Sequence, residues 1–478
     1  MKGGFSMRRT KIVCTLGPAS SSPEVIHSLI EAGMNVARLN LSHGTQADHA
    51  RVIGHIREIS ERIRTPVAIL QDLQGLKIRL GMFRDGRAWL EAGAEFLIST
   101  REVEGTASMA STTYDRLPRD VKAGDRILIA DGLIELKVLG AYGETVRCRV
   151  VVGGEVGDHK GINLPGVAIS ASSMTAKDQA DLQFGIRQGV DYVAVSFVRG
   201  PADVLEVKEL INEAGTTIPV IAKLEKPEAI QHLEDILRVA DGVMVARGDL
   251  GVEMPLEDVP LIQKEVIRRA REHAIPVITA TQMLESMIEH PRPTRAEASD
   301  VANAIFDGTD AVMLSAETAV GKYPVEAVQV MSRIAVQTEQ ALPVLAPAAP
   351  AARASTFPDV ISDTACRAAR EVHARAIVAF TQSGSTARLL AKYRPEVPIL
   401  AFSPSEQIRQ RLSLCWGVVP KTIRPIQHTD ELVDEIEAAL LEEKAVHPND
   451  ALVIVAGAPM WVRGTTNLMK LHRVGGKR

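Results

Sequence analysis

The sequence predicts a (β/α)8 TIM barrel that carries a small inserted β domain and is followed by a C-terminal α/β domain. Short apolar runs alternate with amphipathic helical stretches, eight runs precede residue 315, and polar residues stand where many of these runs end. Eight parallel strands with crossover helices are the number that closes a barrel. A doubly wound open sheet is the alternative that the pattern leaves open. The candidate strands are 11–16, 35–39, 67–70, 192–197, 220–224, 242–246, 276–280 and 311–314.

Polar side chains at the C-terminal ends of these runs are the strongest argument for the barrel. A buried strand does not otherwise favour such residues, and in a barrel the C-terminal strand ends share the face where active sites are found. We therefore expect one site at this face. Its candidate residues are Arg38, Asn40, Asp72, Lys223, Glu225, Asp249, Thr281, Ser315 and Glu317.

The segment 80–161 has a different pattern, with short β-rich pieces separated by Asp-Gly and Gly-rich turns. It predicts a small β-barrel domain inserted into a catalytic barrel made of residues 7–79 and 162–340. Because the insertion follows the third strand, it emerges at the catalytic face, and we expect it to act as a lid that excludes water. A rigid decoration is the alternative. The expected strands of the insertion are 95–99, 126–129, 134–139 and 145–152.

An Ala- and Pro-rich stretch marks a linker over residues 341–356. Residues 357–478 then return to alternating helices and strands, with strands expected at 376–380, 399–402 and 452–456. This part is predicted to be a separate α/β domain.

Composition excludes several classes of protein. Hydrophobic residues make up 46% and charged residues 24%, which is enough apolar material for buried cores and argues against disorder. The net charge is −4 with Lys and Arg dispersed, which argues against nucleic acid as a partner. No apolar run approaches the roughly 20 residues of a membrane span, and no apolar leader is expected at the N-terminus. The scattered Cys14, Cys148, Cys366 and Cys415 suit a reducing cytoplasm.

Alternation along strands groups the candidate side chains. Arg38, Asn40 and Ser42 are expected on one face, as are Lys223 with Glu225 and Arg247 with Asp249. Any one of these groups taken alone is better explained as a structural ion pair.

Together these residues suit phosphoryl transfer. Glu225 and Asp249 supply hard oxygens for Mg²⁺ or Mn²⁺, Arg38 and Arg79 suit phosphate oxygens, and Lys223 supplies charge at the transferring group. The glycines of Ala246-Arg-Gly-Asp-Leu-Gly251 predict a tight turn in which the Gly248 N–H meets a substrate carboxylate.

Six segments of the chain resemble pyruvate kinase and follow one another in the order of that family. Among them are Gly33-Met-Asn-Val-Ala-Arg-Leu-Asn-Leu-Ser-His-Gly44 and Met244-Val-Ala-Arg-Gly-Asp-Leu-Gly251. The six matches are 10–20, 33–44, 221–225, 244–251, 280–287 and 313–318.

The resemblance implies the reaction and the roles of the site residues. Phosphoenolpyruvate would contact Arg38 and Thr281, Mg²⁺ would bind Glu225 and Asp249, and Lys223 would stabilise the transferring phosphoryl group. The nucleotide, ADP or ATP, would face Arg79 and Lys160 in the reaction that yields pyruvate and ATP. Thr281 is a candidate for the proton path, with hydrogen bonding inside the barrel as the alternative. The resemblance also implies a homotetramer.

The family's monovalent cation would be held by Asn40, Ser42, Asp72 and the Leu73 carbonyl. This sequence has Lys77 where potassium-dependent members resemble Gly-Pro-Glu. An ammonium group there carries the charge of K⁺ and favours the same oxygen partners, so we expect potassium to be dispensable. The alternative is a solvated lysine at the lid hinge.

The loop 380–387 follows an expected strand and precedes an expected helix in the C-terminal domain. Hydroxyl groups, a glycine and a helix N-terminus form an anion cradle, and the resemblance implies a phosphorylated sugar or nucleotide effector such as AMP. An ordinary N-cap at Ser383 or Ser385 is the alternative. The predicted effector residues are Thr381, Ser383, Gly384, Ser385, Thr386 and Arg463.

Two other functions compete with the kinase hypothesis. A catalytically silent metabolite sensor would have lost at least one of the core site residues, and all are present. A metal-dependent aldolase would leave the lid and the C-terminal domain without a role.

Overall fold

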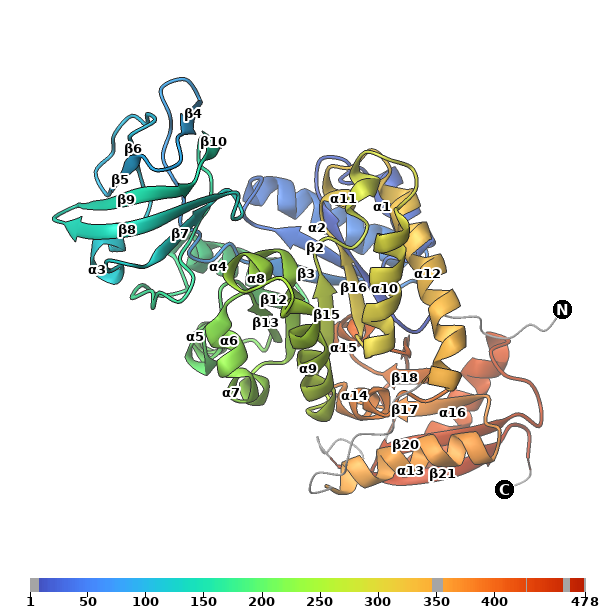
Figure 1. Cartoon of the computed structure of the whole chain (residues 1–478). Coiled ribbons are helices and arrows are strands. Elements are labelled where there is room, and N and C mark those ends of the chain that lie inside the picture. The colour runs from blue at the N-terminus through green and yellow to red at the C-terminus, as the bar shows by residue number, and fades with distance from the viewer. Residues whose placement is uncertain (1–7, 346–355, 427, 459–464, 477–478) are drawn as a thin grey trace.

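The computed structural model describes residues 8–345, 356–426, 428–458 and 465–476 (Figure 1). It shows a central barrel, a β-rich insertion on one side of the barrel, and a C-terminal α/β part at the other end (Figure 1). Arg463 and residues 346–355 of the predicted linker lie outside the described residues.

Eight parallel strands close the central barrel, which rules out the open sheet. Around the barrel the order is β1-β16-β15-β14-β13-β12-β3-β2, so each strand pairs with both neighbours. The strands are β1 (Lys11–Leu16), β2 (Val36–Asn40), β3 (Ala68–Asp72), β12 (Tyr192–Val195), β13 (Val220–Leu224), β14 (Gly242–Ala246), β15 (Val277–Ala280) and β16 (Ala311–Leu314).

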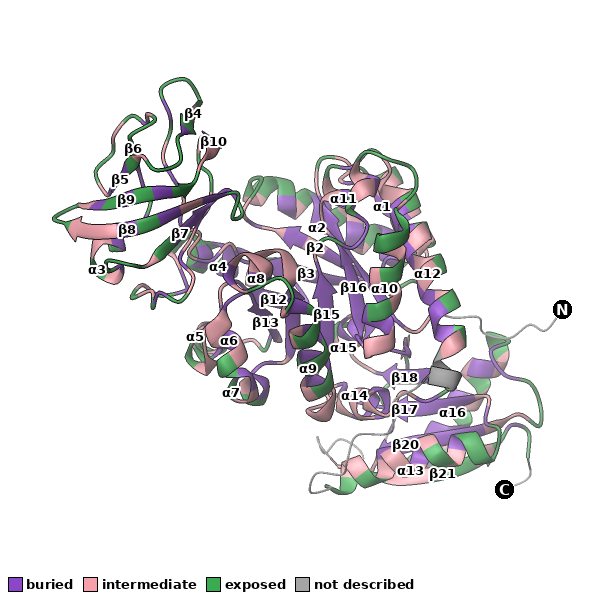
Figure 2. Cartoon of the chain, viewed as in Figure 1, coloured by how far each residue is buried: buried purple, intermediate pink, exposed green. Residues whose placement is uncertain are grey.

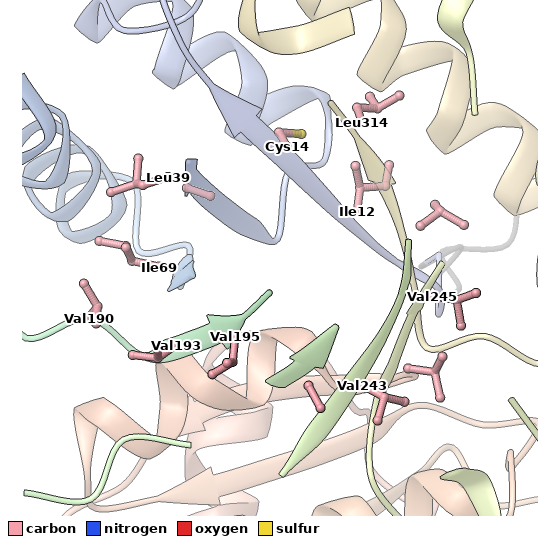
Figure 3. Packing of buried hydrophobic residues seen from close by; sticks show 14 of the residues in the cluster. Ile12, Cys14, Leu39, Ile69, Val190, Val193, Val195, Val243, Val245 and Leu314 are labelled. Carbon is pink, nitrogen blue, oxygen red and sulfur yellow. The ribbon is translucent and has the colours of Figure 1, made fainter. Parts of the chain in front are cut away.

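Each barrel strand places alternate side chains in two different cores. The inner set includes Val13, Leu70 and Met244, which fill the interior of the barrel. The outer set packs against the surrounding helices, and Figure 3 shows part of it, with Cys14 of β1 beside Leu314 of β16. Burial on both sides explains why these strands are continuous apolar runs.

Helices surround the barrel, and several of them begin at a polar N-cap residue. Thr45, Thr175 and Thr294 each form a capping box with the acidic residue three positions on, which satisfies two backbone donors. The helices are α1 (Pro23–Ala32), α2 (Gln46–Arg62), α4 (Ala176–Gln188), α5 (Pro201–Glu213), α6 (Pro227–Gln231), α7 (Leu233–Val239), α8 (Arg247–Glu253), α9 (Val259–Glu272), η1 (Glu285–Ile288), α10 (Arg295–Asp307), α11 (Ala316–Ala319) and α12 (Pro324–Leu345). Since α12 ends at Leu345, the first residues of the predicted linker are helical.

The insertion after β3 is β-rich, as the sequence predicted, and has a core of its own. It forms a six-stranded sheet, β11-β7-β8-β9-β5-β6, and a two-stranded ribbon of β4 and β10. Exposed and buried side chains alternate along β9, whereas every barrel strand except β2 is buried throughout (Figure 2). Its elements are β4 (Arg87–Leu90), β5 (Glu95–Ser99), β6 (Met109–Ser111), α3 (Leu117–Asp120), β7 (Arg126–Ile129), β8 (Ile134–Tyr142), β9 (Thr145–Val152), β10 (Gly154–Gly157) and β11 (Ile162–Asn163).

The C-terminal part contains a five-stranded sheet in the order β19-β18-β17-β20-β21, in which β21 is antiparallel to β20. The sequence missed its two edge strands because β19 contains Pro420 and Lys421 and β21 is largely polar. The elements are α13 (Phe357–Glu371), β17 (Ala376–Phe380), α14 (Ser385–Lys392), β18 (Ile399–Ser403), α15 (Glu406–Arg411), η2 (Leu412–Leu414), β19 (Val418–Thr422), α16 (Thr429–Glu442), β20 (Ala451–Gly457) and β21 (Thr466–Arg473).

A short segment of the C-terminal part closes the N-terminal end of the barrel. Leu414 of η2 is fully buried and belongs to the inner core of the barrel. Nearby, the Tyr192 hydroxyl donates to the Arg411 carbonyl at 2.8 Å, and the Ser413 hydroxyl donates to the Pro66 carbonyl at 3.1 Å. The opposite end of the barrel, where the polar strand ends lie, is left for the site.

Within the described residues, none of the helices combines the length and the apolar character that a membrane span requires.

Candidate active site

Alternation along the inner face explains why charged side chains gather at the C-terminal end of the barrel. On β3 the inner positions are Ala68, Leu70 and Asp72, so two apolar residues are followed by a carboxylate. On β13 the inner residues Ile221 and Lys223 follow the same pattern. The lower positions fill the barrel, and the last position of each strand reaches its mouth.

Lys223 is the centre of a buried ion cluster. Its ammonium group lies 2.9 Å from Glu225 Oε1 and 3.3 Å from Asp72 Oδ1, and donates to Ser196 Oγ at 2.7 Å. Burial by itself lowers the pKa of Lys223, but the Asp72 and Glu225 carboxylates outweigh burial and raise the pKa above its ordinary value. Lys223 therefore remains a positive charge.

Arg38 joins this cluster through Asp72. Its Nε donates to Asp72 Oδ2 at 2.7 Å, and its Nη1 donates to Thr15 Oγ1 at 2.9 Å. Burial raises the pKa of Asp72, but Lys223 and Arg38 more than compensate and hold it below its ordinary value. Asp72 is thus a carboxylate shared by two cations, and it fixes the positions of both.

Glu225 and Asp249 form the pair of carboxylates expected to hold a divalent cation. Glu225 Oε2 accepts from the Phe197 N–H at 2.7 Å, which orients the carboxylate. Burial raises the pKa of Glu225, and the neighbouring charge of Asp249 raises it further, although Lys223 acts in the opposite direction. Two carboxylates whose charges disfavour each other in a buried site fit a bound divalent cation, which would relieve this repulsion.

The described part of the chain has no group of three or more His, Cys, Asp or Glu side chains arranged for a metal. Two carboxylates without a third are consistent with Mg²⁺, which commonly keeps waters and substrate oxygens in its coordination shell.

The structure corrects the predicted geometry around Gly248. Strand β14 ends at Ala246, and residues 247–253 form helix α8 rather than a tight turn. Arg247 and Asp249 therefore do not share a strand face, because residues two apart on a helix point in different directions. Ser42 likewise lies beyond the end of β2, where its N–H donates to Asn40 Oδ1 at 3.1 Å.

Thr281 has a left-handed backbone with φ of 69°, and Gln282 after it has φ of 53°. The Gly248 N–H donates to Thr281 Oγ1 at 2.8 Å, and that hydroxyl donates to the Ala280 carbonyl at 2.6 Å. The N–H predicted to meet a substrate carboxylate is thus bonded to the hydroxyl predicted to serve the proton path.

The guanidinium group of Arg247 holds the Thr281 turn in place. It donates to the Thr281 carbonyl at 2.7 Å and to Asp300 Oδ1 of α10 at 2.7 Å. The sequence singled out neither this role of Arg247 nor Asp300, and a helix residue 53 positions away carries no local signal for it. The sequence analysis also missed Ser196. Tyr192 and Ala194 of β12 point into the barrel, and the same alternation places Ser196 on their side.

Most of the oxygen atoms predicted to hold a monovalent cation already have partners, among them those of Asp72 and the Leu73 carbonyl. Asp72 binds Arg38 and Lys223, and the Leu73 carbonyl accepts from Ser196 Oγ at 2.7 Å. Lys77 lines a small cavity of about 30 Å³ beside Gly161 and Asp249, at the root of the insertion. Lys77 therefore shares one small cavity with Asp249, whereas Glu225 does not line it.

Arg79 and Lys160 lie on the two chain segments that connect the insertion to the barrel. Arg79 pairs with Gly161 in an isolated bridge, and the Leu80 N–H donates to the Lys160 carbonyl at 2.9 Å. Arg79 also donates to the His159 carbonyl at 3.1 Å. The two residues are therefore neighbours, although 81 positions separate them in the sequence.

The predicted effector loop lies in the C-terminal part, away from this cluster. Gly384, with φ of 82°, is the N-cap of α14, so neither Ser383 nor Ser385 is the N-cap. No side chain caps this helix N-terminus. Thr381 Oγ1 accepts from the Gly384 N–H at 2.9 Å, and the Thr386 and Thr466 hydroxyls lie 2.8 Å apart.

Ser383 and Gly384 also line a cavity of about 540 Å³ between the C-terminal part and the N-terminal end of the barrel. Arg388 and Arg411, which the sequence did not single out, line it as well. The loop therefore borders a cationic hollow large enough for a small anion.

The fold and the cationic, carboxylate-bearing mouth define a class: barrel enzymes that act on phosphorylated anions. Residues 7–328 match the family model described as "Pyruvate kinase, barrel domain", and residues 359–472 match "Pyruvate kinase, alpha/beta domain". The chain belongs to the pyruvate kinase family, which transfers the phosphoryl group of phosphoenolpyruvate to ADP and forms pyruvate and ATP.

Curated relatives agree over nearly the whole chain. Pyruvate kinases from Corynebacterium glutamicum and Mycobacterium tuberculosis are each 50% identical over 98% of this chain, covering 98% and 99% of their own lengths. That of Staphylococcus aureus is 48% identical over 98% of this chain and 81% of its own. A solved pyruvate kinase from Cryptosporidium parvum superposes with a TM-score of 0.89 at 37% identity, covering 98% of this chain and 96% of that one.

Proposed function

We propose that the cluster around Lys223 carries the phosphoryl transfer from phosphoenolpyruvate to ADP. Lys223 and Arg38 are fixed cations at the mouth of the barrel, held by the shared Asp72 carboxylate. Arg38 binds the phosphate oxygens of phosphoenolpyruvate, and Lys223 neutralises charge on the group in transfer. The preorganised Arg38–Asp72–Lys223–Glu225 cluster is the observation that carries this proposal.

Glu225 and Asp249 hold Mg²⁺ or Mn²⁺ in this proposal. When bound, the cation supplies Lewis-acid neutralisation of phosphoryl and carboxylate oxygens. Burial and the Asp249 carboxylate raise the pKa of Glu225, and a divalent cation bound between the two carboxylates would offset this repulsion, which supports the assignment.

Thr281 and Gly248 act on the pyruvate end of the substrate. The Gly248 N–H binds the substrate carboxylate, which releases Thr281 Oγ1 from its present hydrogen bond. The freed hydroxyl then serves the path by which a proton reaches the enolate. The short contact between the two groups supports this coupling.

Arg79 and Lys160 bind the nucleotide phosphates at the root of the insertion, and the insertion acts as a lid. Their adjacency across the two connecting segments supports this role. The division into a barrel of 7–79 and 162–340, a lid of 80–161 and a C-terminal domain of 357–478 remains our proposal.

Lys77 makes potassium dispensable. Its place beside Asp249 at the lid root supports a cation supplied by the chain itself. Asn40, Ser42, Asp72 and Leu73 are then the remnant of a potassium site.

The loop Thr381–Thr386 binds a phosphorylated sugar or nucleotide effector. The uncapped N-terminus of α14 and the adjacent cavity with Arg388 support an anion there. Arg463 is assigned to the same effector site from the sequence alone. We further propose a cytoplasmic homotetramer.

One assay tests the central assignment. Purified protein is mixed with phosphoenolpyruvate, ADP and Mg²⁺ in a buffer of organic cations, pyruvate is followed, and potassium is then added. We expect turnover before the addition, a loss of about 100- to 1000-fold in kcat for Lys223→Met, and a potassium requirement in Lys77→Glu. Lys122→Glu, an exposed lysine on the insertion, is the matched control.

The outcomes separate the parts of the proposal. Turnover only with potassium keeps the kinase but contradicts the role of Lys77. No turnover in either condition would favour a silent sensor. Full activity of Lys223→Met would overturn the role of the cluster.

A further inference from the structure

We infer that Glu253 is a positioning residue that ties the lid root to both metal-binding carboxylates. The inference rests on the proposed Glu225–Asp249 metal site. Glu253 is the last residue of α8, the helix that carries Asp249. Its carboxylate connects three parts of the chain that are remote in the sequence.

Two contacts converge on one oxygen of this carboxylate. Lys226 Nζ lies 2.5 Å from Glu253 Oε1, and Asn163 Nδ2 donates to the same oxygen at 2.9 Å. The side chain of Lys226 is 9% exposed and that of Glu253 only 1%. A buried ion pair is weak evidence for stability, so the presence of this one at the site points to a functional role.

The two charged partners are each rigidly linked to a metal carboxylate. Lys226 directly follows Glu225, and Glu253 lies one helical turn after Asp249 on a helix of seven residues. The ion pair therefore sets how far the Glu225 segment stands from the Asp249 helix. A divalent cation tolerates little change in that spacing, because Mg²⁺ demands near-ideal octahedral geometry.

Asn163 lies just after the proposed lid boundary at residue 161 and links the lid to this contact. It belongs to β11, which pairs with β7 of the insertion through Asn163 and Leu128. A second approach lies nearby, because a Cβ on Gly132 of the insertion would stand 3.8 Å from Val252 Cγ1 of α8. The end of α8 thus contacts β11 through Asn163 and lies close to the lid at Gly132.

Glu253 Oε2 is buried and has no hydrogen-bond partner in the structure. Oε1 thus accepts from both Lys226 and Asn163, while Oε2 has no donor. The ion pair with Lys226 positions the two metal carboxylates, and the bond from Asn163 joins β11 to the end of α8.

Metal binding to the free protein tests the inference without recourse to turnover. Mn²⁺ is titrated into wild type, Glu253→Gln and Glu225→Gln, with free Mn²⁺ measured by electron paramagnetic resonance and folding checked by thermal melts. We expect Glu253→Gln to weaken Mn²⁺ binding by about 10- to 100-fold, the usual effect of removing a residue that orients a ligand.

A matched control separates positioning from general damage. Asp191→Asn removes a carboxylate of another buried ion pair, that with Arg57, at the N-terminal end of β12. We expect its Mn²⁺ affinity to equal that of wild type. The Lys226→Met/Glu253→Gln double variant leaves no unpaired buried charge, so it should fold while binding Mn²⁺ as weakly as Glu253→Gln alone.

Asn163→Ala tests the hydrogen bond that links β11 to Glu253. It keeps the ion pair, so Mn²⁺ affinity of the free protein should stay near that of wild type while the KM for ADP rises. Wild-type Mn²⁺ affinity in a folded Glu253→Gln, or in the double variant, overturns the inference. If Glu225→Gln instead binds Mn²⁺ as tightly as wild type, the proposed metal site itself is contradicted.

Discussion

At the scale of residues, the site depends on side chains that never need to touch the substrate. Thr281 and Gln282 adopt backbone conformations that L-residues rarely take, and such strain persists only where surrounding contacts impose it. The Arg247 guanidinium supplies these contacts and is itself anchored to Asp300. Position, rather than chemistry, is what Arg247 contributes.

Arg247→Lys should therefore lower kcat by about 100-fold, because a small displacement of a reacting group is enough for such a loss. Lysine keeps the charge but lacks the planar fork that bonds two groups at once. Steady-state kinetics and deuterium incorporation into the pyruvate methyl group, followed by NMR, measure the effect. The deuterium exchange should fall with kcat.

The control for this variant is Arg269→Lys, which alters an ion pair with Glu265 on the surface helix α9. Equal kcat values in the two variants would mean that Arg247 does not position Thr281.

At the scale of elements, the 3-10 segment η2 is the piece that joins the C-terminal part to the barrel. Three residues long, it places Leu414 among inner residues such as Val13 and Ile221. The hydrogen bond between Tyr192 and the Arg411 carbonyl lies beside it. The barrel core is thus completed by a residue 100 positions after the end of its last strand.

Leu414→Ala should destabilise the barrel by about 2–5 kcal/mol, the usual cost of truncating a buried leucine. The urea midpoint of unfolding, followed by circular dichroism, measures the loss. Leu133→Ala, at a side chain that is 76% exposed on the insertion, should change stability by no more than about 0.5 kcal/mol. A similar midpoint for both variants would show that Leu414 adds no stability to the barrel core.

At the scale of the whole molecule, a buried polar contact couples the start of β1 to the C-terminal sheet. The Lys11 ammonium donates to the Val418 carbonyl of β19 at 2.7 Å. Burial lowers the pKa of Lys11 to about 8, with Arg8 acting in the same direction. The charged form is therefore disfavoured in the folded protein.

The pH dependence of stability follows from this shift. Unfolded lysine keeps its proton to about pH 10.4, whereas folded Lys11 loses it near pH 8. Between these values the unfolded state binds more protons, so the contribution of Lys11 to stability rises with pH. Relative to Lys11→Met, wild type should gain up to about 3 kcal/mol between pH 8 and pH 10.5, at about 1.4 kcal/mol per tenfold change in proton affinity.

Urea midpoints of both proteins at several pH values measure this gain. A difference that does not vary with pH would contradict the burial of a titrating Lys11.

The sequence by itself determined the barrel and which charged residues lie at the C-terminal ends of its strands. Eight apolar runs could be recognised because strands that are buried on both faces consist almost entirely of apolar residues. Asp72, Lys223 and Glu225 could be recognised because charged residues are rare at the ends of such strands. Alternation then grouped Lys223 with Glu225 correctly, since Lys223 lies in β13 and Glu225 directly follows this strand. It failed for Arg247 and Asp249, because the chain turns into α8 directly after Ala246.

Only the tertiary structure decided which distant residues meet. Asp300 anchors Arg247 across 53 positions, Asn163 meets Glu253 across 90, and Leu414 completes a core formed by the first 313 residues. The edge strands β19 and β21 also required the structure, because half-exposed strands lack a continuous apolar pattern. Local sequence encodes burial and turn chemistry, whereas contacts between remote segments arise only when the barrel closes and the other parts pack against its two ends.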